Sequence, residues 1–387
     1  MFDLYSGNTP SRLNKEHFKG TVNWISSGEL KEHYIYSSKE QISEEAAKSL
    51  KLLPVGTFVI AIYGLEAEGV RGTGSIIQEP STISQACMSF IPKGVIENEF
   101  LYSWYKKHGN VIGIRYAQGT KQQNLSYDIL EKFMIVYPNT KEQEKLNKFI
   151  SLLDERITTQ NKIIEDLKKL KSAIVEKVFC SPNQEYPMCR IEGFEQALST
   201  YKMSDFSSRI ASKNKDSKCS LVLTIAAQYG LVNQESFFNK SVASDNLTGY
   251  YLLHKGEFAY NRSYSAGYDW GAVKRLDNYD EGVLSTLYIC FKINETIVDS
   301  DYLAYYFESS KWHKGLSDIA GEGARNHGLL NVSITDYFNT KHRFPVIEEQ
   351  KAIAKMLNTI TEKERKATLL GECYQKQKQY LLRQMFI

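Results

Sequence analysis

Residues 137–150 read "YPNTKEQEKLNKFI", and residues 344–357 read "FPVIEEQKAIAKML". Each stretch places a proline a few residues ahead of an acidic residue and a glutamine, and each then enters an apolar pattern typical of an amphipathic helix. The two stretches lie 207 residues apart in a chain of 387. Their recurrence predicts an internal repeat, in which one structural plan is used twice.

Other segments recur in the same order, which supports the repeat. The offset between copies rises from 200 to 207 along the chain, as small loop insertions would cause. Short runs rich in β-branched and aromatic residues, such as "TFVIAIY" (57–63) and "KFMIVY" (132–137), predict strands in a mixed α/β domain. The matching segments are 53–63 with 253–263, 100–105 with 302–307, 118–126 with 321–330, 142–157 with 349–364, and 176–179 with 383–386.

Each copy ends in a predicted helix of about 38 residues with a seven-residue apolar repeat. Eight of ten seam positions are apolar in the first helix and seven of ten in the second, where Gly371 weakens the helix locally. An amphipathic helix on a globular domain is the alternative, but such helices usually have about 8–20 residues. The predicted seam residues are Leu146, Ile150, Leu153, Ile157, Ile164, Leu167, Ile353, Leu357, Ile360 and Leu381, and the seam is interrupted by Gln160, Lys171, Glu364 and Lys378, which would set the register or face a partner.

A helix of this size is about 57 Å long at about 1.5 Å per residue, so its own domain cannot bury the whole seam. The simplest partner for each seam is the other helix. We therefore expect an α+β protein, with two pseudo-repeated mixed α/β domains separated by two long antiparallel coiled-coil helices. The expected segments are a first recognition domain at 1–140, a spacer helix at 141–180, a second recognition domain at 181–347 and a second spacer helix at 348–387.

Composition restricts the class of protein. The net charge of +3 permits nucleic-acid binding without requiring it. Six scattered cysteines without a C-x-x-C motif predict reduced thiols and no metal site. The longest apolar run, "FVIAIY" (58–63), is too short to cross a membrane, and the first residues contain no apolar segment typical of a signal peptide. We expect a cytoplasmic protein that does not contact a membrane.

Catalytic motifs are missing from the sequence. None of the eight prolines is adjacent to another, which excludes the Asn/Asp-Pro-Pro-aromatic motif of amino-group methylation. There is no Gly-Lys-Ser/Thr for a phosphate-binding loop and no H-E-x-x-H among the seven histidines. The glycine-rich "GVRGTGS" (69–75) fits a turn between strands, and "ELK" (29–31) would suggest a nuclease only beside an aspartate. We expect no enzymatic activity in this chain.

Taken together, the chain resembles the specificity (S) subunit of bacterial type I restriction-modification systems. The resemblance rests on "GNTPSR" and "VNWISSGEL" within 7–30, on "GTKQQNLS" (119–126) followed by Pro-x-x-x-Glu-Gln, and on "RIEGFEQAL" (190–198). One departure is that the lead at 184–203 has no counterpart in the first half, which starts at "MFDLYSGNTP". Two expectations follow from this departure: either the first domain is missing an edge strand or its start is trimmed, and either one puts the integrity of the first head in question.

The resemblance implies a non-catalytic scaffold that reads double-stranded DNA. The target would be bipartite, with two short specific sequences separated by an unread gap. Two methyltransferase (modification) subunits and the restriction subunits would dock on the chain. It would hold no cofactor itself, because S-adenosylmethionine and ATP are expected on the partner subunits of a complex that methylates adenine and cleaves DNA.

Residues common to both halves cannot encode a difference between two half-sites. Lys121 and Gln122, with their counterparts Arg325 and Asn326, are therefore expected to contact the DNA backbone or to position it. Base contacts are expected where the halves differ, at 62–72 and 262–271, since arginine can bind guanine and glutamate can accept from cytosine. The candidates for base readout are Glu66, Glu68, Arg71, Arg262, Tyr264 and Tyr268, each of which could instead be a plain loop residue.

Two other interpretations stay open. The chain could be the specificity subunit of another restriction-modification type, or a coiled-coil protein–protein scaffold without DNA contact. A stand-alone enzyme is a third possibility, disfavoured by the missing motifs. Salt-dependent DNA binding separates a DNA reader from a pure scaffold, because phosphate contacts release counterions.

Overall fold

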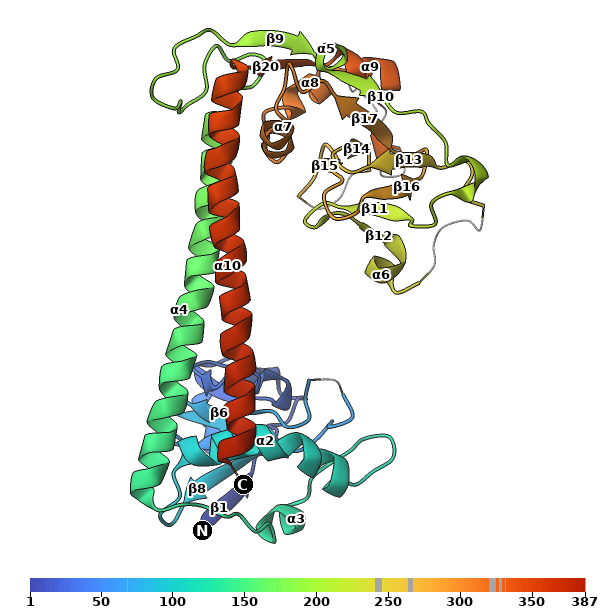
Figure 1. Ribbon diagram of the computed structural model, residues 1–387. Coiled ribbons are helices and arrows are strands. Elements are labelled where there is room, and N and C mark those ends of the chain that lie inside the picture. The colour runs from blue at the N-terminus through green and yellow to red at the C-terminus, as the bar shows by residue number, and fades with distance from the viewer. Residues whose placement is uncertain are drawn as a thin grey trace. The chain divides into compact units, whose positions relative to one another are not determined.

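Figure 1 shows the computed structural model, which describes residues 1–67, 69–240, 246–263, 267–319, 325–326, 329–330 and 332–386. The chain divides into two compact units, whose limits differ from those of the sequence repeats. Unit 1 comprises Met1–Asn161 and Leu369–Ile387, and unit 2 comprises Lys162–Thr368. Each unit thus contains one mixed α/β head and a part of both long helices. The expected four-segment division of the chain stays a prediction.

The two long helices are α4 (Thr140–Val178) and α10 (Ile347–Met385), of 39 residues each. Within unit 1 they run antiparallel, since Asp154 of α4 pairs with Lys378 of α10, and Arg156 lies 4.7 Å from the ring of Tyr374. All ten predicted seam residues are buried or half-buried. The sequence prediction of a coiled-coil pair is therefore confirmed, and Lys378, one interruption of the seam, forms an ion pair with Asp154 of the other helix.

The head of unit 1 is built on a five-stranded sheet in the order β1-β8-β5-β6-β3. Phe58 of the central strand packs against Tyr102 and Tyr105 of helix α2 (Asn98–Tyr116), with ring centroids 6.0 and 5.8 Å away. A second sheet has the order β4-β2-β7. The strands are β1 (Phe2–Ser6), β2 (Val22–Ile25), β3 (Tyr34–Ile35), β4 (Glu40–Ile42), β5 (Phe58–Ala61), β6 (Gly74–Ile77), β7 (Ser81–Ile83) and β8 (Cys87–Pro92), with helices η1 (Lys15–Phe18), η2 (Ser27–Glu29), α1 (Glu44–Ala47), α2 (Asn98–Tyr116) and α3 (Tyr127–Glu131).

The head of unit 2 contains a sheet in the order β10-β17-β14-β15 and four two-stranded pairs, β11-β12, β13-β16, β18-β19 and β20-β9. Its strands are β9 (Ser199–Lys202), β10 (Ser207–Arg209), β11 (Leu223–Ala226), β12 (Gly230–Asn233), β13 (Tyr251–His254), β14 (Phe258–Asn261), β15 (Ala272–Arg275), β16 (Glu281–Leu284), β17 (Ile289–Ile293), β18 (Arg325–Asn326), β19 (Leu329–Leu330) and β20 (Lys341–Phe344). Its helices are α5 (Met203–Phe206), η3 (Lys215–Ser217), α6 (Gln234–Phe238), α7 (Ser300–Tyr306), α8 (His313–Ser317) and α9 (Ile334–Asn339).

The two heads share one sheet plan. The antiparallel order β1-β8-β5-β6 in unit 1 matches β10-β17-β14-β15 in unit 2. The register matches too, because Phe58 lies opposite Phe90 and Phe258 lies opposite Phe291. The predicted repeat of two mixed α/β heads is confirmed, and the register gives a residue-by-residue correspondence between them.

The repeated Glu-Gln pair is explained by its glutamine. Gln143 donates to the carbonyls of Pro138 (2.9 Å) and Val95 (3.0 Å) and accepts from the N–H of Glu97 (3.0 Å). Gln350 makes the same three bonds in unit 2, at 2.9 Å, 3.1 Å and 2.9 Å, with Pro345, Ile297 and Asp299 in the corresponding roles. Both side chains are buried, so each fixes the start of a long helix to its head.

The far end of each long helix packs in the unit of the other repeat. Phe179, which follows α4, lies 5.0 Å from the ring of Tyr302 in unit 2. Phe386, which follows α10, lies 5.3 Å from the ring of Phe100 in unit 1. These phenylalanines are the last residues of the matching segments 176–179 and 383–386, and each belongs to the core of one unit.

One strand prediction was wrong. "KFMIVY" was expected to form a strand, but residues 133–137, all of them described, form none. The counterpart of this run in unit 2 is β20, which forms a strand by pairing with β9. Because a strand needs a partner for its backbone groups, the same type of run stays irregular without one.

Candidate functional site

In each unit a predicted base-contact loop and a predicted backbone-contact segment lie side by side. In unit 1 the N–H of Leu125 donates to the carbonyl of Ile62 at 2.8 Å. In unit 2 the N–H of Leu330 donates to the carbonyl of Arg262 at 2.9 Å. Ile62 and Arg262 each directly follow the central strand of a head, so the two heads carry their variable loops on the same backbone anchor.

Gln123 holds the unit 1 loops together. Its backbone N–H donates to the Glu66 carboxylate at 2.8 Å, and its side-chain oxygen accepts from Arg71 Nη2 at 2.8 Å. The Gln123 N–H also keeps the pKa of Glu66 below its ordinary value, with the nearby Arg71 charge acting in the same direction. The sequence analysis chose Gln122 and missed Gln123, although both belong to the segment "GTKQQNLS".

Arg71 and Glu66 therefore each make an intramolecular hydrogen bond with Gln123, Glu66 at an exposed position. The stem of Arg71 lies against α2 at Gly113, where an added Cβ would come within 2.6 Å of the arginine Cγ. Glycine at 113 is thus what lets the arginine lie flat on the helix. To read a base, Arg71 would have to break its hydrogen bond with Gln123. The role of Arg71 and Glu66 in base readout stays a prediction.

Lys121 and Gln122 occupy the exposed tip of a closed loop. The loop is closed by two backbone hydrogen bonds of 2.9 Å between Gln118 and Asn124. Gly119 adopts a φ of +109°, and a Cβ there would lie 2.0 Å from the Gln122 carbonyl, so this turn requires glycine. A cation held at such a tip is well placed for a phosphate contact.

Arg262 connects two other segments of unit 2 by hydrogen bonds from its side chain. Its Nη1 donates to the carbonyl of Val332 at 3.1 Å, and its Nη2 donates to that of Leu287 at 3.2 Å. Its unit 1 counterpart, Ile62, is apolar and buried. Arg325 and Asn326 lie in β18, next to β19. The candidates Glu68 and Tyr264 lie outside the described residues.

Tyr268 lines a cavity of about 700 Å³ within unit 2, between the head and the unit's part of α4. Lys171 of α4 reaches into the same region, 3.3 Å from the Glu308 carboxylate and 5.5 Å from the Tyr305 ring. Burial lowers the pKa of Lys274, another lining residue. Lys171, an interruption of the predicted seam, thus joins helix to head.

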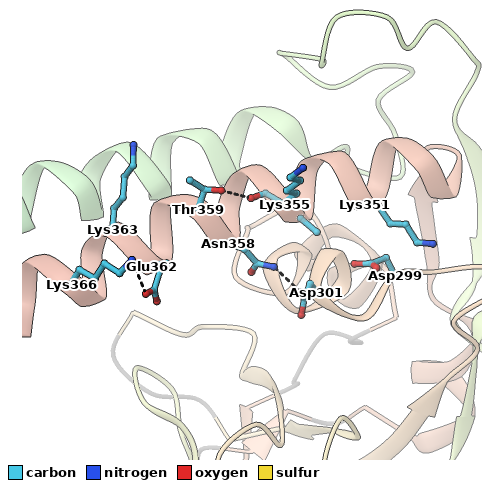
Figure 2. Close-up of a pocket in the computed structure, with 10 residues that line it drawn as sticks. Asp299, Asp301, Lys351, Lys355, Asn358, Thr359, Glu362, Lys363 and Lys366 are labelled. Atoms are coloured by element: carbon cyan, nitrogen blue, oxygen red, sulfur yellow. Dashed lines mark hydrogen bonds and ion pairs between the residues drawn. The ribbon is translucent and has the colours of Figure 1, made fainter.

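A second cavity of about 590 Å³ lies in unit 2 along α10, beside the start of α7 (Figure 2). Asn358 of α10 points toward Asp301 and donates to it at 2.7 Å (Figure 2). Hydrogen bonds from Arg365 lower the pKa of Glu362 to about 2, so this carboxylate is charged at neutral pH. Lys366 pairs with Glu362 at 3.4 Å, and three further lysines that line the cavity, Lys351, Lys355 and Lys363, make this face of α10 cationic.

A polar cluster in unit 1 links head and helices. His33 lies between the rings of Tyr34 and Tyr102, 4.0 and 3.9 Å away and nearly parallel to both. Its Nε2 is 2.9 Å from Glu99, and its Nδ1 is 3.8 Å from Asp154 of α4, which also binds Lys378 of α10. Burial lowers the pKa of His33, but the neighbouring Asp154 and Glu99 carboxylates outweigh it, and the pKa is raised.

Within the described ranges, no cluster of three or more His, Cys, Asp or Glu side chains is placed to hold a metal ion. Among the same residues, no helix is long and apolar enough to cross a bilayer.

Comparison with known proteins shows which proteins the chain is similar to. Residues 1–169 match the family described as "Type I restriction modification DNA specificity domain". The MjaIX specificity subunit of Methanocaldococcus jannaschii is 29% identical over 183 residues, covering 46% of this chain and 41% of that protein. The EcoR124I/EcoR124II specificity subunit of Escherichia coli is 31% identical over 170 residues, covering 43% and 41%. Each alignment spans less than half of the relative's length.

These matches confirm the resemblance to the specificity subunits of type I restriction enzymes. Solved structures agree in fold. The S subunit from M. genitalium matches with a TM-score of 0.53 at 16% identity, covering 100% of this chain and 94% of its own. A second solved structure, which concerns complex assembly and conformational transition of the type I R-M system, matches with a TM-score of 0.57 at 13% identity. The match covers 98% of this chain and 96% of that chain.

Proposed function

We propose that the protein is the DNA-recognition subunit of a type I restriction-modification complex and that each head reads one half of a bipartite target. The observation that carries the proposal is the repeated backbone anchor, Leu125 on Ile62 and Leu330 on Arg262. It holds two different loop sequences at the same place on two heads of the same plan. Different loops on equivalent anchors are what a reader of two unlike half-sites requires.

The residues divide into two roles in this proposal. Lys121 and Gln122, with Arg325 and Asn326, contact the phosphate backbone or position it, which suits residue types common to both heads. Base contacts come from the loops at 62–72 and 262–271, which differ between the heads. Because Arg71 and Arg262 donate to protein groups in the free protein, DNA binding would either release these side chains or use them to hold the loops in shape.

The partner subunits would dock on the outer faces of the long helices. On α4, Phe149 and Leu152 are exposed in unit 1, and Ile163 and Leu170 are exposed in unit 2. Exposed apolar residues of this size on a charged helix are typical of an interaction surface. We propose that two modification subunits bind here and that the restriction subunits join them in a cytoplasmic complex. Catalysis, S-adenosylmethionine and ATP would belong to the partners.

The test is co-expression with the modification subunit from the same locus, followed by methylation mapping of the host DNA. The proposal predicts a new adenine-methylated motif made of two specific sequences and a gap. A stable complex that methylates no such motif would contradict it. As a control, the modification subunit expressed alone should leave no motif.

A coiled-coil scaffold without DNA contact is the second candidate function. It is favoured because Arg71 and Arg262, the two arginines proposed for base readout, both donate hydrogen bonds to groups of the protein itself. DNA affinity measured across salt concentrations separates the two functions. A DNA reader loses affinity steeply with salt, in proportion to the number of phosphates it contacts. A scaffold would show no saturable DNA binding at low salt.

A further inference from the structure

Lys274 of unit 2 is a half-buried lysine without a charged partner among the described residues. It lies in β15, the edge strand of its sheet, opposite the fully buried Ala259 of β14. Within the described part of the chain, its Nζ has neither a hydrogen-bond acceptor nor a carboxylate at ion-pair distance. Burial lowers the pKa of this lysine more than the charge of Glu308 raises it. An ammonium group withdrawn from water without a partner costs folding free energy.

The carboxylates that line the same cavity of about 700 Å³ do not pair with this lysine. Glu308 pairs with Lys171 of α4 at 3.3 Å. Glu176 accepts from the N–H and the hydroxyl of Ser310, both at 2.7 Å, and pairs with Lys311 at 3.5 Å. These two ion pairs leave two lysines and one carboxylate around the cavity, namely Lys168, Lys274 and Glu364. The cavity therefore has a surplus of positive charge.

The fold itself does not require a charge at this place. Lys274 lies opposite Ala259 in unit 2, and Ser75 lies opposite Val59 in unit 1, so the shared register makes Lys274 the counterpart of Ser75. Ser75 is fully buried, and its hydroxyl donates to the carbonyl of Glu32 at 2.6 Å. The same position is thus neutral and hydrogen-bonded in unit 1 but charged and unpaired in unit 2. Local violations of this kind are expected where a residue serves a ligand.

The surroundings of the cavity indicate which ligand this is. Its wall includes Gly267, Tyr268 and Gly271 of the loop at 262–271, which is expected to contact bases. Lys274 follows the end of that loop by three residues. Only an anion can neutralise its ammonium group, and lysine binds phosphate as a point charge. A DNA strand read by this loop would carry a phosphate on each nucleotide past the cavity.

We propose that this cavity receives a phosphate group of the DNA backbone and that Lys274 binds it. The inference rests on the proposed function and deepens it, because it assigns to the head of unit 2 a backbone contact that the head of unit 1 lacks. Lys168, which is exposed on α4, would support the same phosphate from the helix side. A free phosphate ion has the same chemistry as a backbone phosphate, so the test includes both sources.

The experiment uses the complex of the protein with its modification subunit and two fluorescently labelled duplexes. One duplex carries the methylated motif mapped for that complex, and the other has a scrambled sequence. Lys274→Met should weaken binding to both duplexes by a similar factor, about fivefold at physiological salt, and reduce the salt slope by about one unit. Fluorescence anisotropy at several salt concentrations measures both effects. Lys274→Ser, which introduces the residue of unit 1, should give the same result.

Stability provides a second readout, because it separates a binding residue from a structural one. Lys274→Met should leave the free energy of unfolding unchanged or raise it, since the variant no longer withdraws an unpaired charge from water. DNA affinity would then fall while stability does not. A loss of stability with both variants would overturn the proposal, because the lysine would then support the fold.

Lys292→Met is the matched control, since Lys292 is exposed on β17 of the same sheet and does not line the cavity. It should bind both duplexes as the unaltered complex does. Unchanged DNA binding by Lys274→Met, or a loss confined to the motif, would overturn the inference and leave the proposed function intact. Absence of salt-dependent binding by the unaltered complex would instead contradict the proposed function.

Inorganic phosphate is the probe for a free ion, tested by thermal denaturation of the full-length protein. We expect millimolar phosphate to stabilise the unaltered protein no more than it stabilises Lys274→Met, because a single ion lacks the other contacts of a DNA strand. Stabilisation that depends on Lys274, together with unchanged DNA binding by the variant, would make the cavity a site for a free phosphate and would overturn the assignment to DNA.

Discussion

At the scale of single residues, the two buried glutamines Gln143 and Gln350 have the clearest consequence. Each satisfies two carbonyls and one N–H where a head meets its long helix. The sequence shows each one only as half of a Glu-Gln pair. Its partners lie up to 53 residues away along the chain, so the sequence predicted the repeat but not the bonds that explain it.

Replacement of Gln143 by leucine should destabilise unit 1 by about 2–4 kcal/mol, because buried backbone groups lose their partners. Chemical denaturation, followed by intrinsic fluorescence, measures this change. Gln122→Leu, at an exposed position, should alter stability by less than about 0.5 kcal/mol. Equal effects of the two substitutions would contradict the role assigned to Gln143.

His33 should make unit 1 sensitive to pH. Because the folded-state pKa of His33 is raised above 6.5, its contribution to stability is fully present below that value. The contribution is lost as pH rises through the folded pKa. Burial acts to raise the pKa of Asp154, but the neighbouring His33 ring and the Lys378 ammonium, which donates to Asp154, lower the pKa overall. The Asp154 contribution is therefore present above 3.8 and lost as pH falls through the lowered value.

We therefore expect His33→Gln to cost more stability at a pH just below 6 than at a pH above 8, as measured by denaturation at each pH. His254→Gln, at an exposed position in unit 2, serves as the control for the substitution itself. A cost for His33→Gln that is the same at both pH values would show that the ring acts through stacking on Tyr34 and Tyr102 alone.

Lys121 is the exposed cation at the tip of the unit 1 loop. Lys121→Ala should weaken DNA binding about equally for all sequences and reduce the salt slope by about one unit, as expected for one lost phosphate contact. Affinity titrations at several salt concentrations measure both. Lys145→Ala, an exposed site on α4, serves as the control. A loss confined to one target sequence would make Lys121 a base reader instead.

At the scale of elements, each long helix belongs to two units. Its start is fixed by a glutamine to the head that precedes it, and its end packs in the other unit through Phe179 or Phe386. A heptad pattern could predict the helices and their seam. It could not predict this exchange of ends, because the packing of Phe386 on Phe100 joins residues of different repeats that lie far apart in the sequence.

The exchange of ends predicts a reciprocal pair of effects. Phe386→Ala should increase amide hydrogen exchange in α2 of unit 1 and leave α7 of unit 2 unchanged. Phe179→Ala should do the reverse. Each loss should cost about 3–5 kcal/mol in its own unit, the usual range for a buried phenylalanine. Effects of both variants on the same helix would contradict the assignment of the ends.

At the scale of the whole molecule, two sequence repeats build two units that each draw on both repeats. The repeat and the mixed α/β class could be predicted, since both depend on local pattern and order. The strand at "KFMIVY" could not, because strand formation depends on a partner that pattern does not reveal. The hydrogen bonds of the two loop arginines could not be predicted either, because contacts between loops leave no periodic pattern in the sequence. These bonds join Arg71 to Gln123, and Arg262 to Leu287 and Val332.

The central claim is that each head reads its own half of a bipartite target, and exchange of one head tests it most directly. Residues 1–140 are replaced by the corresponding segment of a specificity subunit with a different target, the hybrid is expressed with the modification subunit, and the methylated motif is mapped. Our account predicts that one half of the motif changes while the other half stays the same. A change in both halves, or in neither, would contradict it.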